Sequence, residues 1–222
     1  MRQRTIRNIH EKIKVHHAPG SRLVTRPMEQ KGKWEERFAN RGDLCLELGC
    51  GKGQFLISRA GAIPEKNFIG VEGQPSVLYR ALEKSGESLL DNLCFMEGFV
   101  RDPLDYFAPE ELSAIYLNFS DPWPKARHSK RRLTSPGYLK AYQTILREGG
   151  TLEIKTDNRG LYEYTLETMG SLGMEPDTQT EDLHGEGHPA AGFTTEYEDK
   201  FRKEGKGIYY IRWTRSSGAS NS

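Results

Sequence analysis

Short apolar runs alternate with amphipathic stretches along most of the chain, and the two patterns predict different elements. Apolar runs bounded by glycine or polar residues indicate buried strands, which are expected at 44–48, 68–72, 93–96, 114–119, 151–156 and 208–213. Apolar residues spaced three or four apart indicate helices, which are expected at 54–60, 76–90, 135–146 and 161–169. Strands that alternate with helices favour an α/β fold, in which a mostly parallel sheet carries helices on both faces.

The predicted elements divide the chain into three parts. Residues 41–214 hold them and are expected to form one domain. Residues 1–40 are predicted to be a basic N-terminal arm, for which an ordered and a flexible structure are both open. A short helix is expected around Trp34 and Phe38, where the arm leads into the core. Residues 215–222 are expected to form a disordered tail.

One predicted helix carries signals at both ends. Ser135 and Pro136 are typical of an N-cap followed by a first-turn proline. Gly149-Gly150 is expected to end the same helix.

The composition favours a globular protein of the cytoplasm. The 222 residues carry a net charge of +1 with 10% aromatics, so the modest apolar content does not indicate disorder. No apolar run approaches the ~20 residues of a membrane helix, and the N-terminus lacks the apolar stretch of a signal peptide. Cys45, Cys50 and Cys94 form no CxxC pair and are expected to be buried thiols. These features argue against membrane proteins and secreted disulfide scaffolds.

Charge is segregated along the chain. Residues 1–41 hold 11 Lys and Arg against 4 Asp and Glu, and residues 123–160 hold 9 against 3. Residues 42–122 and 161–200 are acidic, with 6 against 13 and 1 against 10. Clustered cations release counterions from phosphates, so the basic blocks favour a polyanionic partner. A solvated face is the alternative.

A glycine-rich turn follows the first predicted strand, where ligands of parallel sheets bind. Its pattern is GxGxG, with Glu47 two positions before Gly49, and Glu72 ends the next strand. A carboxylate in that second position can accept both hydroxyls of a ribose. The dinucleotide pattern is GxGxxG, whereas a sulfonium cofactor with an ammonium group favours a nearby carboxylate. The turn therefore indicates S-adenosylmethionine over NAD, with a tight turn that holds no ligand as the alternative.

The segment after the fourth predicted strand, NFSDPWPK, is stiff because two prolines flank a tryptophan. Such a loop can hold Asp121 and Lys125 in fixed places beside the cofactor. The basic run from Arg127 to Arg132 follows and is interpreted as a phosphate clamp. The alternatives are a rigid surface turn with Trp123 as a core anchor, and a solvated charge run.

Several motifs, in order from Trp34 to Trp213, resemble the bacterial tRNA (guanine-N7)-methyltransferase family of class I S-adenosylmethionine-dependent methyltransferases. They are ELGCGKGQFL, GVEGQP, NFSDPWPKARHSKRRLTSPGYL, LEIKTDN and TTEYEDKF. The resemblance implies a Rossmann-like methyltransferase sheet with a C-terminal antiparallel strand. It also implies methyl transfer from S-adenosylmethionine to N7 of guanine at tRNA position 46.

The resemblance also implies roles for individual residues. The cofactor would be held by Glu47, Gly49, Gly51, Glu72, Phe99 and Asp121, and Asp121 would also be catalytic. The substrate would be bound by Lys125, Asp157, Thr195, Glu196, Tyr197 and Glu198. RNA would be contacted by Arg127, His128, Ser129, Lys130, Arg131 and Arg132. Phe99 departs from the family, which usually has an acidic residue at that place; the nearest carboxylate is Asp102.

The chemistry needs no general base, because guanine N7 has a lone pair and no proton. Positioning for in-line attack should supply most of the catalysis, and Asp121 is assigned a placing and electrostatic role. For Asp157, a site role and a helix N-cap remain equally open. Histidines at 16, 17, 184 and 188 lack further ligands at metal spacing, so no metal is expected. The expected partner is tRNA, with no membrane; monomer and homodimer both remain open.

Two other functions remain as alternatives. NxxDPWP resembles the Asn/Asp-Pro-Pro-aromatic motif of exocyclic-amine methyltransferases, although Trp123 stands where those enzymes have the second proline. A non-catalytic RNA-binding protein that kept the fold is the third function considered. The intact set of Glu47, the glycines and Glu72 argues against it.

Overall fold

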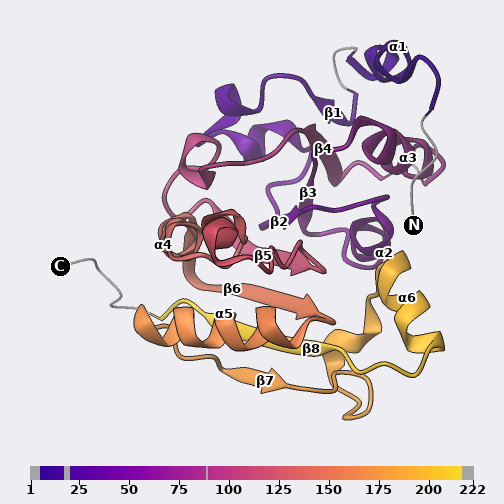
Figure 1. The fold of residues 1–222 in the computed structure, drawn as a ribbon. Helices are drawn as coiled ribbons and strands as arrows, with labels where there is room; N and C mark the ends of the chain where they lie inside the picture. The colour runs from indigo at the N-terminus through magenta and orange to yellow at the C-terminus, as the bar shows by residue number, and fades with distance from the viewer. Residues whose placement is uncertain (1–5, 18–20, 89, 217–222) are drawn as a thin grey trace.

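A computed structural model describes residues 6–17, 21–88 and 90–216. In this part of the chain an eight-stranded sheet runs in the order β1-β4-β3-β2-β5-β6-β8-β7 (Figure 1). The strands are β1 (Leu23–Val24), β2 (Leu44–Leu48), β3 (Asn67–Glu72), β4 (Leu93–Glu97), β5 (Leu112–Asn118), β6 (Leu146–Thr156), β7 (Thr178–Thr180) and β8 (Tyr209–Thr214). The α-helices are α1 (Ile9–Lys14), α2 (Gln54–Ala62), α3 (Pro75–Gly86), α4 (Pro136–Ile145), α5 (Arg159–Ser171) and α6 (Glu196–Lys203).

Strands β1 to β6 pair in parallel, and β8 runs antiparallel to both β6 and β7. The predicted α/β class and the C-terminal antiparallel strand are confirmed. Strand β2 pairs with β3 on one side and with β5 on the other, so the order of the strands reverses there. Open α/β sheets bind ligands beyond the carboxyl ends of the strands at such a reversal.

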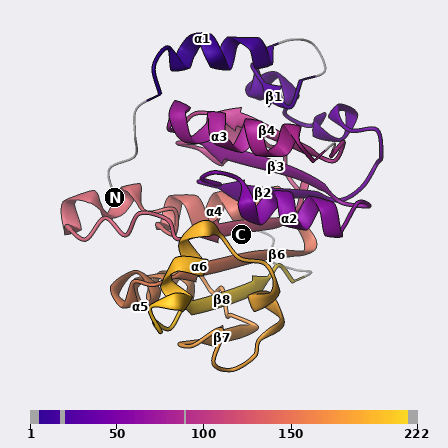
Figure 2. The same cartoon turned by 90° about the vertical axis from the view of Figure 1, so that its right-hand side faces the viewer.

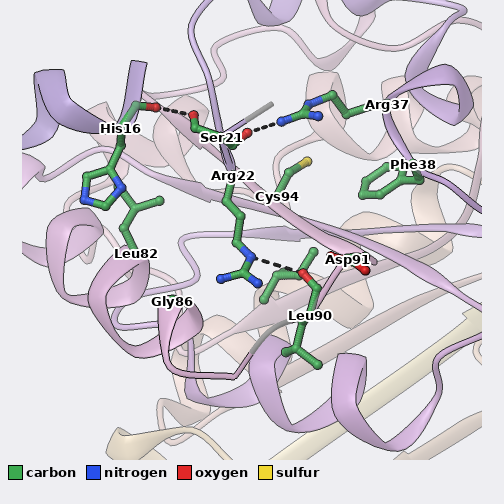
Figure 3. A pocket seen from close by; sticks show the side chains of 11 residues that line it. His16, Ser21, Arg22, Arg37, Phe38, Leu82, Gly86, Leu90, Asp91 and Cys94 are labelled. Atoms are coloured by element: carbon green, nitrogen blue, oxygen red, sulfur yellow. Dashed lines mark hydrogen bonds between the residues drawn. The ribbon is translucent and has the colours of Figure 1, made fainter. Parts of the chain in front are cut away.

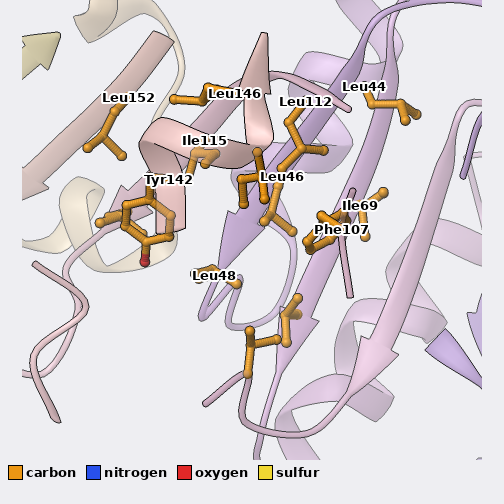
Figure 4. Close-up of a cluster of buried hydrophobic side chains, with 14 of the residues drawn as sticks. Leu44, Leu46, Leu48, Ile69, Phe107, Leu112, Ile115, Tyr142, Leu146 and Leu152 are labelled. Atoms are coloured by element: carbon orange, nitrogen blue, oxygen red, sulfur yellow. The ribbon is translucent and has the colours of Figure 1, made fainter. Parts of the chain in front are cut away.

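The core lies on both faces of the sheet, because successive side chains of a strand point to opposite faces. Along β2, Leu44, Leu46 and Leu48 join a cluster with α4 and α5, while Cys45 joins one with α2 and α3. Figure 4 shows part of the first cluster, around Leu46 and Tyr142. Figure 2 shows α2 and α3 along the opposite face. All three cysteines are free and buried, as predicted.

Part of the predicted N-terminal arm packs into the domain. Strand β1 extends the sheet beside β4, with Leu23 opposite Phe95. The short helix expected around Trp34 is the 3₁₀ turn Trp34–Arg37. The Trp34 indole is fully buried, stacks on Phe107 and donates to the Tyr106 carbonyl at 2.9 Å. Leu23, Val24 and Trp34 of the predicted arm therefore belong to the buried core. Strand β1 was not predicted, because a two-residue strand is too short to show a period.

The start of β6 corrects a predicted helix end. Helix α4 begins after Ser135, as expected, but it ends at Ile145. Gly149 and Gly150 lie inside β6, where they exchange backbone hydrogen bonds with Arg215 at 2.9 Å. Gly149 has φ of +71°, a conformation that favours glycine, and this residue lies within a strand and does not cap the helix. The predicted tail stays a prediction, since residues 217–222 lie outside the described ones.

A cavity of about 310 Å³ lies where the N-terminal segment meets the start of β4 (Figure 3). Two arginines on its wall are already bonded to the main chain. Arg22 donates to the Leu90 carbonyl at 3.1 Å and to the Ser85 carbonyl, and Arg37 donates to the Ser21 carbonyl. Burial lowers the pKa of Arg22. The arginines of this cavity therefore fasten the N-terminal segment to the domain.

None of the described helices is long and apolar enough to cross a membrane.

Candidate cofactor and substrate cleft

A cleft of about 1030 Å³ lies beyond the carboxyl ends of β2 and β5, between α3 and α6. Six of the residues that line it were predicted from the sequence: Gly49, Gly51, Asp121, Thr195, Glu196 and Tyr197. Other lining residues were not predicted, including Ser76, Arg80, Asn118, Phe119 and Lys200. The cleft therefore joins the predicted cofactor turn, the Asp121 loop and the start of α6 in one place.

Glu47, the penultimate residue of β2, has a buried carboxyl group of which only one oxygen accepts a hydrogen bond. Its side chain is 1% exposed, and Asn118 donates to Oε1 at 2.7 Å. The second oxygen, Oε2, is buried without a hydrogen-bond partner in the described structure. Burial, opposed by the Asn118 bond, raises the pKa of Glu47 to about 8. A buried acceptor without a partner is costly, so this oxygen favours a donor supplied by a ligand.

The glycine turn brings backbone to the cleft without side chains. Gly49 and Gly51 have φ of +79° and +59°, and a Cβ on either would meet no atom within 4 Å. The Gly51 amide donates to Glu72 Oε2 at 3.1 Å, and the Gln74 amide donates to Oε1 at 2.7 Å. Burial raises the pKa of Glu72 while these amides lower it. Each carboxylate oxygen keeps a further lone pair for a hydroxyl group.

Phe99 lies beside this turn, outside the set of residues that line the cleft. A Cβ on Gly73 would come within 2.3 Å of the Phe99 ring, so the ring covers the backbone directly after Glu72. The Phe99 side chain is 75% exposed. Its predicted contact with a cofactor stays a prediction.

The Asp121 loop leaves β5 with unusual backbone geometry. Phe119 and Trp123 have φ of +54° and +40°, in the left-handed region that non-glycine residues seldom adopt. Asp121 is exposed and lines the cleft. Trp123 is half-buried and is not part of the core, so the core-anchor alternative is wrong.

The basic run forms a 3₁₀ segment, Ala126–Arg131, after Lys125. Lys125, Arg127 and Lys130 are exposed. The Arg131 guanidinium lies over the Trp123 ring at 4.9 Å, and the His128 ring meets the same ring edge-on. None of the six predicted RNA contacts lines the cleft. All three guanidinium groups of the run also contact the protein itself: Arg127 donates to His128 Nε2 at 3.2 Å, Arg131 lies over Trp123, and Arg132 donates to the Pro122 carbonyl.

Helix α6 forms one wall of the cleft and was not predicted. The Thr195 hydroxyl accepts from the Glu198 amide at 3.0 Å and caps the helix. Tyr197 stacks on Phe201 and lies 5.0 Å from the Phe119 ring, between centroids. The Tyr197 hydroxyl donates to Asp157 Oδ2 at 3.4 Å. This contact links the residue after the carboxyl end of β6 with the first turn of α6.

Glu198, which was predicted to bind substrate, has a fully buried carboxylate that pairs with Lys155 at 3.2 Å and His184 at 2.8 Å. These contacts hold α6 on the sheet, and Glu198 is not among the residues that line the cleft. Its substrate contact stays a prediction. Asp157 is not a helix N-cap, because Asn158 takes that position and accepts from the Leu161 amide at 2.8 Å.

Among the described residues, no group of three or more His, Cys, Asp and Glu is placed to hold a metal ion.

Comparison with known proteins agrees with this geometry. A family model described as "Putative methyltransferase" matches residues 41–211. A "tRNA (guanine-N(7)-)-methyltransferase" of Limosilactobacillus reuteri (strain DSM 20016) is 49% identical over 82% of this chain and 85% of its own. A protein of the same name from Lachnoclostridium phytofermentans is 43% identical over 90% and 97% of the two chains.

Solved structures share the fold at low sequence identity. The 16S rRNA methyltransferase KamB has a TM-score of 0.63 at 12% identity, over 83% of this chain and 93% of that one. The antibiotic-resistance methyltransferase Kmr has a TM-score of 0.57 at 20% identity, over 85% and 93%.

Fold and cleft together define the class of protein as a Rossmann-like methyltransferase that uses S-adenosylmethionine. The similarity over most of the chain carries the assignment further. Within that class, the chain belongs to the tRNA (guanine-N7)-methyltransferase family.

Proposed function

We propose that this protein transfers a methyl group from S-adenosylmethionine to N7 of guanine at position 46 of tRNA. The observation that carries the cofactor in this proposal is the unpaired, buried Oε2 of Glu47 in the strand that leads into the cleft. It favours a cationic ligand group beside the glycine turn. Membership of the family supports tRNA as the substrate. We place the protein in the cytoplasm, where tRNA is found.

The glycine turn that lines the cleft and the two carboxylates beside it, outside the lining itself, fit S-adenosylmethionine. Glu47 would accept the ammonium group, Glu72 would accept the ribose hydroxyls, and Gly49 and Gly51 leave open space for the ligand. When bound, S-adenosylmethionine supplies an electrophilic methyl group on a sulfonium. Burial strengthens the attraction of the ionised Glu47 carboxylate for a cation, because the effective dielectric is low there.

The opposite part of the cleft fits a guanine base. Asp121 lines the cleft, and Asp157 is joined to the cleft wall by the hydrogen bond that it accepts from the Tyr197 hydroxyl. Either carboxylate can accept from the N1–H and the exocyclic amine of guanine, which places N7. The ring gains positive charge during the reaction, so a carboxylate also stabilises the transition state. The base must leave its stack to reach this place.

A tRNA transcript with guanine at position 46 and a matched transcript with adenine there test the position. We expect labelled methyl transfer from S-adenosylmethionine to the first transcript alone. Equal labelling of both would contradict position 46 while leaving the family assignment intact.

Replacement of Glu72 tests the ribose site. Glu72→Ala leaves hydroxyl groups without an acceptor, which costs about 1–3 kcal/mol, and therefore should weaken S-adenosylmethionine binding by about 5- to 150-fold. Glu97→Ala is the matched control, because Glu97 pairs with Glu72 in register on β4 and is exposed. Calorimetry measures both. Unchanged affinity in Glu72→Ala would remove Glu72 from the cofactor site.

Replacement of exposed cations in the basic run from Arg127 to Arg132 tests whether this run binds RNA phosphates. Arg127→Ala and Lys130→Ala should weaken binding to all tRNAs alike, because phosphate contacts carry no base information. The slope of log affinity against log salt should fall by roughly 0.7–0.9 for each lost contact. Filter binding at several salt concentrations measures this. Salt lines parallel to that of the wild type would mean that the run is only solvated.

A further inference from the structure

We propose that Arg132 is a positioning residue, which holds the Asp121 loop, and is not an RNA contact. The proposal rests on the proposed role of Asp121 in the same site. The proposal gives Arg132 a different role from its neighbours in the basic run, although their charges are the same in the sequence.

The Arg132 guanidinium makes two hydrogen bonds and one ring contact with the protein. Its Nε donates to the Pro122 carbonyl at 3.0 Å, and its Nη2 donates to the Trp123 carbonyl at 3.0 Å. The same group lies over the Tyr164 ring of α5, 4.1 Å from the centroid. Arg132 is half-buried, whereas Arg127 and Lys130 are exposed. A planar fork suits two adjacent carbonyls in a way that an ammonium group does not.

The loop needs such a support. Prolines at 122 and 124 have no N–H to donate, so the loop has few hydrogen bonds of its own. Trp123 adopts φ of +40°, a backbone conformation that persists only when the surroundings enforce it. Arg132 ties two consecutive carbonyls, directly after Asp121, to a helix that follows β6. It therefore fixes the place from which Asp121 meets the cleft.

The decisive variant is Arg132→Lys, which keeps the charge and removes the fork. We expect a 10- to 100-fold lower kcat, since a misplacement of about 1 Å can cost that much. The salt slope of tRNA binding and the affinity for S-adenosylmethionine should stay as in the wild type. A phosphate contact would give the opposite pattern, with a lower slope in Arg132→Gln and wild-type kcat in Arg132→Lys.

A second pair of variants tests the same support from α5. Tyr164→Leu removes the ring under the guanidinium and should lower kcat with an unchanged salt slope. Tyr164→Phe keeps the ring and should match the wild type. This pair decides the question even if Arg132→Lys does not fold.

Wild-type kcat in both Arg132→Lys and Tyr164→Leu would overturn the proposal. So would a salt slope in Arg132→Gln that falls as much as in Lys130→Ala. A wild-type protein that transfers no methyl group would instead sink the proposed function, so the two failures are distinguishable.

Discussion

Asp121→Ala is expected to lower kcat by about 10²-fold or more while leaving the Kd for tRNA nearly unchanged. The carboxylate lines the cleft and lies off the basic run, so it acts on the reacting base and not on the phosphates. Removal of one group that stabilises transition-state charge typically costs 10²–10³-fold. Single-turnover methyl transfer at saturating substrate concentrations measures the effect.

Two controls make the Asp121 result specific. Asp105→Ala removes another exposed carboxylate, which does not line the cleft, and should keep the wild-type rate. Asp121→Asn keeps an oxygen that accepts from guanine and should retain more activity than Asp121→Ala. If the wild-type rate rises with pH through an ionisation that is absent in Asp121→Ala and Asp121→Asn, Asp121 is a general base. That result would contradict its role in placing the guanine.

Glu47→Gln is expected to weaken S-adenosylmethionine binding by about 30-fold or more. Truncating one partner of a buried charge pair costs about 2–5 kcal/mol, and Glu47 is 1% exposed. At pH 7 the carboxyl group is mostly protonated, because burial raises its pKa to about 8. Binding of a cation should therefore release a proton, which calorimetry in two buffers of different ionisation enthalpy detects. The variant should show no such release.

The same substitution should stabilise the ligand-free protein at alkaline pH. The folded pKa of Glu47 lies above its ordinary value of 4.5, so the folded state binds the proton more tightly than the unfolded state. The free energy of unfolding of the wild type therefore falls as pH rises from 4.5 through about 8. Glu47→Gln removes this loss, so its Tm should exceed that of the wild type at pH 9 but not at pH 4. Identical profiles of Tm against pH for the wild type and Glu47→Gln would contradict a raised pKa of the buried Glu47 carboxyl group.

The sequence predicted the strands of the sheet well where apolar runs end in glycine or a carboxylate. Strands 44–48 and 68–72 are examples, since turn chemistry limits them on the carboxyl side. Strand β1 was missed because two residues show no alternation, and β7 because Thr178–Thr180 is polar. Helix α6 was missed because its residues are mostly charged, and its docking depends on Lys155, 43 positions from Glu198.

The candidate site was predictable where side chains lie at or shortly after the carboxyl end of a strand. Glu47, Glu72 and Asp121 are such residues, and they gather at one end of the sheet because the strands are parallel. The burial of Glu198 depends on partners from distant segments, so no local pattern could show it. Arg132 carries the same charge as Lys130, and only packing against the loop distinguishes the two.

Mass analysis of nucleosides tests the central claim most directly. An unmodified tRNA is incubated with the protein and S-adenosylmethionine, digested and separated against standards of each methylguanosine. The account predicts 7-methylguanosine at no more than one per tRNA, and its loss with Asp121→Ala. A methyl group on the exocyclic amine, or no methylated nucleoside at all, would contradict it.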